Sequence, residues 1–351
     1  MDKIIKLVDK TINIASKEGK TSVFLIGNTK KEEDKDFYTI PIRSYSQIVA
    51  TGAIVFGEKI AKDIAKSIDG KVDYVFVDSE KKIIDRNSVS TAPGNIQRAV
   101  SEIITDSVLI SYKANDLSVD AADAFISEYF SNDVANLGGK KTAIIGAGNI
   151  GSKIAVKLVE RGSDVFLYRR KTEKLEKTVE YINNSKPQYT VAKAWVSTSI
   201  LDACNSADII IGLTNGIAVI NKKAISIANP NPLIIDIGKG SISKSAVLLA
   251  HSLNIEVYRL SVESALEGML ISTISTHNIY KERTGRGIYK GMNVVSGSIL
   301  AHENEFVVDD FNSPKIIYGL GNGEGDFQRN LDNKMLSKLK TFKKIINKNN
   351  I

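Results

Sequence analysis

Three glycines, Gly146, Gly148 and Gly151, have the G-x-G-x-x-G spacing of a dinucleotide-binding turn. An apolar run, 142–145, precedes them, and apolar residues at helical spacing follow them. The first glycine permits the tight turn, the second lets the backbone approach a pyrophosphate, and the third lets helix and strand pack closely. The N–H groups at the helix start would hold the diphosphate. The contacts that we expect are Gly146, Ala147, Gly148, Asn149, Ile150 and Gly151.

The end of the next predicted strand, 165–168, indicates which dinucleotide binds. NAD sites place an acidic residue about 20 positions beyond the motif, on the ribose 2′-hydroxyl. Here the strand end reads Tyr-Arg-Arg-Lys-Thr, without an acid. A guanidinium can bind a 2′-phosphate through two charge-assisted hydrogen bonds, whereas a carboxylate would repel it. We therefore expect NADP as the cofactor, although a solvated basic strand end is the alternative. The predicted phosphate contacts are Arg169, Arg170, Lys171 and Thr172.

Three later strand ends carry polar residues or glycines. They are 214–216 (Thr-Asn-Gly), 236–240 (Asp-Ile-Gly-Lys-Gly) and 261–263 (Ser-Val-Glu). Because ligands of an open α/β sheet bind at the carboxyl ends of its strands, these residues could contact the nicotinamide half. Simple turns are the alternative. The predicted contacts are Thr214, Asn215, Gly216 and Gly238.

Hydride transfer to a carbonyl also needs a group that gives or takes a proton. Lys113 stands between two predicted helices, just ahead of the predicted cleft between two domains, where burial would lower its pKa. Asp116 or Asp120 could orient its ammonium group. We predict Lys113 and Asp116 as catalytic residues, although an exposed lysine is the alternative in a lysine-rich chain. The other candidates are the histidines, His251, His277 and His302.

The amino-terminal part also offers residues that could hold a polar substrate. Arg43 could clamp a carboxylate, and Ser44 and Ser46 could add hydroxyl contacts. Asn115 lies between Lys113 and Asp116 in the sequence, and Asp120 follows them. We predict these five residues as substrate contacts.

Composition is that of an ordinary soluble enzyme. The chain has 351 residues, longer than one core usually grows, and a formal charge of +7. Six lysines lie in the tail, 334–348, and predict a solvated terminal helix with one packed face. Cys204, the only cysteine, is expected in the core, and a cysteine–histidine zinc site is excluded.

We expect no membrane, nucleic acid or metal as a partner, although contact of the basic tail with a nucleic acid or an acidic membrane is the alternative. No apolar run approaches about 18 residues, and the amino terminus lacks a signal-peptide core, so we expect a cytoplasmic protein. His302 beside Glu303 and Glu305 fits a solvated face better than a metal site. The predicted partners are a small-molecule substrate and a second copy of the chain, in a homodimer.

Strands alternating with helices predict an α/β protein. Six strands beginning near 142, 164, 189, 208, 233 and 255 imply a Rossmann-type, doubly wound parallel sheet, preceded by a separate N-terminal α/β substrate domain. In that earlier part we predict helices over 48–68 and 96–110. The expected domains are 1–137 for substrate and catalysis, 138–285 for NAD(P), and a C-terminal extension, 286–351. In the extension the glycine-rich segment 319–325 predicts a turn or flap.

The nucleotide half resembles the shikimate/quinate dehydrogenases. It is more loosely similar to methylenetetrahydrofolate dehydrogenases and two-domain amino-acid dehydrogenases. The motifs are Gly146-Ala-Gly148, the basic strand end 169–172, residues 207–216 and Gly268-Met-Leu270. The resemblance implies that Met269 borders the nicotinamide and that a lysine lies near the reacting carbon, which favours Lys113. The chain has Thr273 where that family's Gly-Met-Leu is followed by Gln, which leaves the substrate open.

Together these features predict an NADP-dependent oxidoreductase. It would transfer a hydride between nicotinamide and a small polar, carboxylate-bearing substrate, as shikimate dehydrogenases do. The alternatives are an amino-acid or methylene-tetrahydropterin dehydrogenase on the same scaffold, or a non-catalytic sensor that binds NADP(H).

Overall fold

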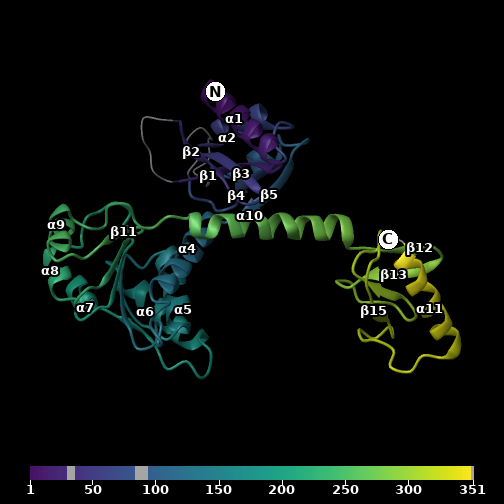
Figure 1. Cartoon of the computed structure of the whole chain (residues 1–351). Helices are drawn as coiled ribbons and strands as arrows, with labels where there is room; N and C mark the ends of the chain where they lie inside the picture. Colours follow the sequence, from purple (N-terminus) through teal and green to yellow (C-terminus); the bar gives the residue numbers. More distant parts are fainter. Residues whose placement is uncertain (30–35, 84–93, 349–351) are drawn as a thin grey trace. The chain divides into compact units, whose positions relative to one another are not determined.

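The chain folds into two compact units, Met1–Met269 and Leu270–Ile351. The computed structural model describes residues 1–29, 36–83 and 94–348 (Figure 1). The first unit contains a five-stranded and a six-stranded sheet, and the second contains a four-stranded sheet. Within the described residues, no helix is both long enough and apolar enough to cross a membrane.

The first sheet has the order β2-β3-β1-β4-β5, with only β2 antiparallel to its neighbour. Its strands are β1 (Thr21–Asn28), β2 (Phe37–Ser44), β3 (Ile48–Val55), β4 (Tyr74–Asp78) and β5 (Val108–Tyr112). The associated helices are α1 (Asp2–Glu18), α2 (Glu58–Ile68), α3 (Ile96–Ser101) and α4 (Ala114–Tyr129). The central strand β1 is buried along nearly its whole length, as expected for a parallel strand covered on both faces.

Two helices predicted in this region are each wrong over part of their length. Residues 48–68 begin as the strand β3, and helix α2 starts only at Glu58. The segment is apolar on both sides of an extended chain, so it fits a sheet interior. Gly52 permits the close pairing, because a Cβ there would lie 2.2 Å from the Leu25 carbonyl oxygen.

The second wrong helix is 96–110. Helix α3 ends at Ser101, and 108–112 pair in parallel with β4 as strand β5. The Asp69 carboxylate accepts hydrogen bonds from the N–H groups of Thr105 (3.0 Å) and Ser107 (3.0 Å) and so holds the loop between them. Lys113 therefore lies between a strand and a helix, not between two helices.

The six-stranded sheet confirms the predicted Rossmann topology. Its order is β11-β10-β9-β6-β7-β8, and every pairing is parallel. The strands are β6 (Lys141–Ile145), β7 (Asp164–Tyr168), β8 (Ala194–Val196), β9 (Ile209–Gly212), β10 (Leu233–Asp236) and β11 (Val257–Arg259). The helices are α5 (Asn149–Glu160), α6 (Thr172–Ser185), α7 (Ile200–Cys204), α8 (Lys222–Ser226) and α9 (Lys244–Ser252).

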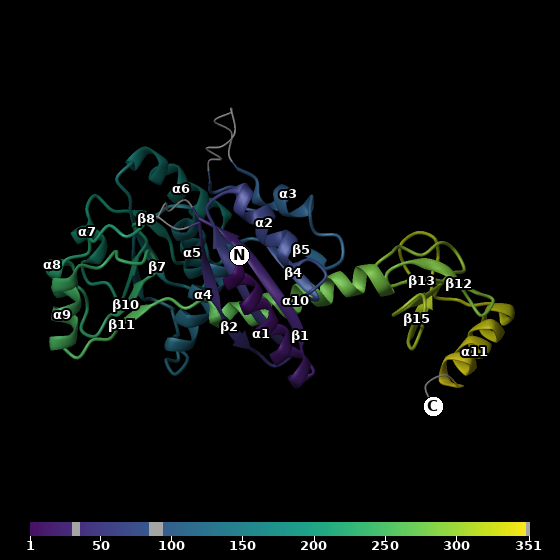
Figure 2. The same ribbon diagram turned by 90° about the horizontal axis from the view of Figure 1, so that it is seen from above.

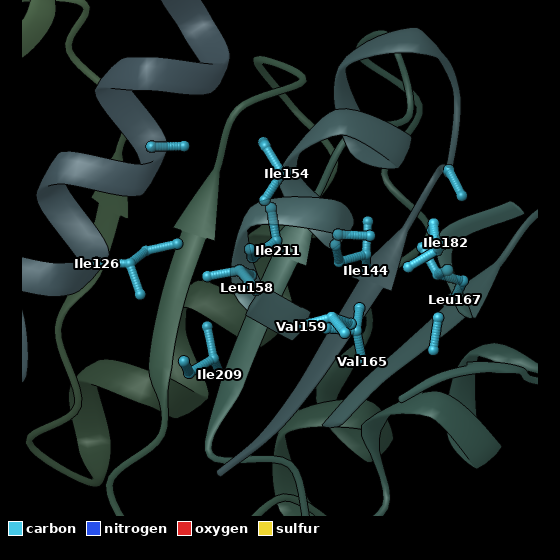
Figure 3. Packing of buried hydrophobic residues seen from close by; sticks show 14 of the residues in the cluster. Ile126, Ile144, Ile154, Leu158, Val159, Val165, Leu167, Ile182, Ile209 and Ile211 are labelled. Atoms are coloured by element: carbon cyan, nitrogen blue, oxygen red, sulfur yellow. The ribbon is translucent and has the colours of Figure 1, made fainter. Parts of the chain in front are cut away.

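One face of this sheet packs on helices α4 and α5. Ile144 and Ile211 of the strands meet Ile154 and Leu158 of α5, and Ile126 joins them from α4 (Figure 3). Helix α4 thus belongs to the packing of the nucleotide-binding sheet. Cys204 is fully buried on α7, as predicted, and burial raises the pKa of its thiol to about 12.

The second unit begins within α10 (Glu263–Asn278), which continues as a short π-helix (Ile279–Arg283). Its sheet has the order β12-β13-β14-β15, and β12, β13 and β15 are labelled in Figure 2. The strands are β12 (Arg286–Tyr289), β13 (Met292–Ser296), β14 (Phe306–Val308) and β15 (Ile317–Leu320). Phe342 and Ile346 of α11 (Asn333–Lys348) pack against β13, β14 and β15, so the predicted terminal helix with one packed face is confirmed.

Candidate functional site

The glycine turn has the geometry of a dinucleotide cradle. Gly146 has φ +101°, and a Cβ there would lie 2.5 Å from the Leu213 carbonyl oxygen. Above Gly148 the nearest atom to an added Cβ is 3.9 Å away, which leaves the backbone open to a ligand. Gly151 fits tightly, since its Cβ would lie 3.3 Å from Ile144. The conformation and surroundings of each glycine thus fit its role in the motif. Helix α5 begins at Asn149, directly after the turn.

The basic end of β7 lies beside this turn. The Gly146 N–H donates to the Tyr168 carbonyl oxygen at 2.9 Å, and Arg169 Nη1 donates to the Ala147 carbonyl oxygen at 3.4 Å. Arg169 is half-buried, and Arg170 is exposed. Over the described residues, neither guanidinium pairs with a carboxylate. The structure thus brings Arg169 to the turn and leaves both guanidinium groups available. Lys171 and Thr172 follow, both exposed, at the start of α6.

Two further strand ends join the same edge. Ser241 Oγ accepts a hydrogen bond from the Thr214 N–H (3.0 Å), and the Asp236 carboxylate accepts from the Gly240 N–H (2.6 Å). A Cβ on Gly238 would lie 2.7 Å from the Thr214 nitrogen. The loops after β9 and β10 are therefore locked together next to the glycine turn. The other two loop residues have positive φ angles, +52° at Asn215 and +82° at Gly216.

A polar cluster that the sequence reasoning missed lies at the carboxyl edge of the N-terminal sheet. Asp78, only 1% exposed, ends β4. Its carboxylate accepts hydrogen bonds from Lys82 Nζ (2.7 Å) and Asn28 Nδ2 (3.1 Å). Lys82 also pairs with Glu80 at 2.9 Å. Asn28 is buried too, and its Oδ1 has no hydrogen-bond partner among the residues that the structure describes.

Tyr112 closes the cluster from β5. Its hydroxyl lies 3.4 Å from where a Cβ on Gly27 would stand, so it reaches β1 beside Asn28. Burial, followed by the negative charges of Asp78 and Glu80, raises the pKa of Tyr112. The signal in the sequence was the polar end of two apolar strands, Asn28 and Asp78, at the edge where an open α/β sheet binds ligands.

Asn115 connects this cluster to the glycine turn. Its N–H donates to Glu80 Oε2 (2.8 Å), and its Nδ2 donates to the Oδ1 of Asn149 (3.4 Å). Asp116 pairs with Lys153 of α5, and with Lys113 at 3.7 Å. The predicted neighbours Asn115 and Asp116 thus reach both sheets of the first unit.

The predicted proton donor is not enclosed. The side chain of Lys113 is 63% exposed, so the burial expected for it is not observed. Asp120 pairs with Lys157 at 3.2 Å. The catalytic and substrate roles of these residues stay predictions.

Arg43, Ser44 and Ser46, predicted to bind a substrate, contact acidic side chains of the chain itself. Arg43 pairs with Glu263, and Ser46 donates to Glu267 from its N–H (2.9 Å) and its hydroxyl (2.5 Å). Ser44 donates to Glu18 Oε2 at 2.7 Å. These three residues are thus engaged with acids outside the polar cluster, and their role as substrate contacts stays a prediction.

The remaining candidates lie outside both clusters. Met269 is half-buried in α10, and His251 is exposed in the last turn of α9. His302 Nδ1 lies 3.5 Å from Glu305, which is buried and pairs with Arg286 at 2.9 Å. Across 1–29, 36–83 and 94–348, no three histidine, cysteine or acidic side chains form a group that could hold a metal ion.

Residues 141–240 match the family described as NADP oxidoreductase, coenzyme F420-dependent. This segment holds the glycine turn, the basic strand end and the two locked loops. This segment is therefore a Rossmann-type NAD(P)-binding domain, and with it the chain is an NAD(P)-dependent oxidoreductase that uses a nicotinamide cofactor. The resemblance to shikimate dehydrogenases stays a hypothesis. No curated protein matches the whole sequence significantly.

Several solved structures are similar to this chain at low sequence identity. L-tryptophan dehydrogenase from Nostoc punctiforme is 14% identical with a TM-score of 0.43, covering 75% of this chain and 80% of that one. A dipicolinate synthase chain from Bacillus halodurans is 12% identical with a TM-score of 0.35, covering 72% and 97%. Ornithine carbamoyltransferase from Campylobacter jejuni is 13% identical with a TM-score of 0.42, covering 78% and 96%. At these values the likeness says nothing about substrate.

Proposed function

We propose that the chain is an NADP(H)-preferring dehydrogenase that acts on a small polar substrate bearing a carboxylate, in the manner of shikimate dehydrogenases. The observation that carries the preference for NADP(H) is the hydrogen bond from Arg169 to the glycine turn at Ala147. A guanidinium at this position can reach a 2′-phosphate on the adenosine ribose, and no carboxylate of the strand end opposes it. When bound, the cofactor supplies or accepts the hydride at nicotinamide C4.

The cofactor preference is tested with Arg169→Ala. Hydrogen bonds to charged groups contribute about 1.5–3 kcal/mol, so calorimetry should find NADPH bound roughly tenfold to a hundredfold more weakly. NADH, which lacks the phosphate, should lose almost nothing. Lys177→Ala, an exposed lysine on α6, is the matched control and should leave both affinities unchanged. Equal losses for the two cofactors would refute the preference.

For the substrate, we propose the polar cluster at the N-terminal sheet edge. Lys82 offers an ammonium group that Asp78 and Glu80 hold in one place, with 17% of its side chain exposed. A group held in this way suits proton transfer to a carbonyl oxygen better than a mobile surface lysine. Lys113, assisted by Asp116, is the alternative acid–base group. Asn28 Oδ1 is an unused acceptor that could receive a substrate hydroxyl or amine.

Turnover separates this function from its alternatives. NADPH consumption with keto acids, imines and cyclic ketones distinguishes a shikimate-like reduction from amino-acid or methylene-tetrahydropterin chemistry. Consumption with carboxylate-bearing cyclic ketones alone would support the proposal. NADPH binding without turnover of any panel member would favour the non-catalytic sensor instead.

A further inference from the structure

The C-terminal unit contains a hollow of about 540 Å³ that the proposed reaction does not use. Val307 of β14 lines it, whereas its neighbours Phe306 and Val308 pack toward α11. Because successive side chains of a strand point to opposite faces, the hollow lies on the face of the sheet that α11 leaves uncovered. Its volume is in the range of small-molecule sites, roughly 300–1,000 Å³.

Two aromatic side chains, Tyr318 and Phe327, line the hollow, and each lies close to a glycine. A Cβ on Gly319 would lie 2.4 Å from the Phe327 ring, and one on Gly297 would lie 3.4 Å from the Tyr318 ring. The Phe327 ring therefore lies directly against the backbone of Gly319, and the Tyr318 ring is in ordinary contact distance of Gly297. Yet Tyr318 is 54% and Phe327 44% exposed, so much of each ring stays open to a ligand. Large rigid aromatic surfaces of this kind favour stacking with another planar group.

One positive and one negative side chain line the same hollow. The Arg283 side chain is exposed and has no hydrogen-bond or ion-pair partner among the described residues. Asp309 Oδ1 accepts the N–H groups of Lys315 (2.9 Å) and Ile316 (2.8 Å), which fixes the carboxylate. In the described part of the chain, its Oδ2 makes no hydrogen bond, and the two charges do not pair with each other. Each can still bind a group of opposite charge.

We propose that this hollow is a second ligand site, for an aromatic α-amino acid in its zwitterionic form. Arg283 binds the carboxylate through two parallel hydrogen bonds, and Asp309 accepts from the ammonium group. The aromatic side chain lies against Tyr318 and Phe327. This site belongs to the second unit, so it is independent of the proposed dehydrogenase function.

Calorimetry of the full-length chain with L-phenylalanine, without NADPH, tests the site. One molecule should bind per chain, and Arg283→Ala should weaken the affinity about tenfold to a hundredfold. Asp309→Asn, which keeps the acceptor for the two N–H groups, should also weaken binding. Arg329→Ala is the matched control, because Arg329 is a 90% exposed arginine of the same unit and does not line the hollow. All variants should bind NADPH like the unaltered chain.

Three ligand analogues separate the contributions. Phenylacetate lacks the ammonium group, phenethylamine lacks the carboxylate, and L-alanine lacks the ring; each should bind more weakly than L-phenylalanine. The proposal is overturned if millimolar L-phenylalanine gives no heat, or if Arg283→Ala binds it as tightly as the unaltered chain. The second result would place any binding outside this hollow. Phenylacetate binding as tight as that of L-phenylalanine would overturn the role of Asp309.

Discussion

At the scale of single residues, the cluster of Asn28, Asp78 and Lys82 concentrates the chemistry of the N-terminal sheet. Burying a carboxylate lowers the stability of the fold unless the group is paired and hydrogen-bonded. The Asp78 carboxylate is 1% exposed, and it pairs with Lys82 and accepts a hydrogen bond from Asn28. The surrounding network therefore holds the Lys82 ammonium group in a defined position. Lys113, in contrast, reaches solvent beside one carboxylate at 3.7 Å.

The two lysines make different predictions for turnover. If Lys82 gives the proton, Lys82→Met should lower kcat about 10²–10⁴-fold, because that is the usual contribution of a general acid. Lys113→Met should then change kcat little. Steady-state kinetics on a substrate found in the turnover panel, with NADPH affinity and circular dichroism as checks of folding, provide the measurement. The reverse pattern would return the role to Lys113 and Asp116.

At the scale of elements, the parallel helices α4 and α5 are joined by a ladder of ion pairs. The Asp123 carboxylate accepts from Arg161 Nε (2.6 Å) and Nη2 (2.9 Å), and Lys157 lies 3.6 Å from it. Lys153 pairs with Asp116 nearer the glycine motif. The ladder fixes the helix that follows the glycine turn against the helix that carries Asn115.

Removing the end of this ladder that lies away from the glycine motif should loosen α5. The side chain of Asp123 is 13% exposed and that of Arg161 is 42% exposed, so screening limits the pair to about 1 kcal/mol. Asp123→Asn should lower the free energy of unfolding by about that amount in urea titrations. Glu176→Gln, an exposed acid on α6, is the control and should change it much less. Identical losses in both variants would show that the ladder does not stabilise the fold.

At the scale of the whole molecule, two compact units predict two unfolding events. NADPH should raise the midpoint of the transition of the first unit only, because a ligand stabilises the folded state that binds it. At a hundredfold excess over Kd the gain is about 2.7 kcal/mol. Differential scanning calorimetry with and without NADPH measures this. A single transition that shifts as a whole would mean that the two units unfold cooperatively.

The homodimer remains a proposal for light scattering to test.

The nucleotide-binding sheet could be predicted because its signals are local. The glycines, the strand before them and the helix after them lie within about twenty residues, and each requirement is met by neighbouring residues. The basic strand end is local for the same reason. In contrast, residues 48–55 and 108–112 form strands because neighbouring strands pair with them. Local sequence propensity carries no information about such pairing partners.

The sequence alone predicted the six-stranded parallel sheet and its glycine turn. It also indicated the basic residues, 169–172, that are candidates for binding a dinucleotide phosphate. Only the tertiary structure decided which polar residues meet. Asn28 and Asp78 are fifty positions apart and touch because β1 and β4 pair in the sheet, which also brings Lys82 to them. Arg43 of β2 and Glu263 of α10 likewise meet across 220 positions, a contact that no local pattern of residues records. The periodicity of apolar residues indicates which face of an element is buried. Contact between distant side chains depends instead on which elements become neighbours in the folded chain.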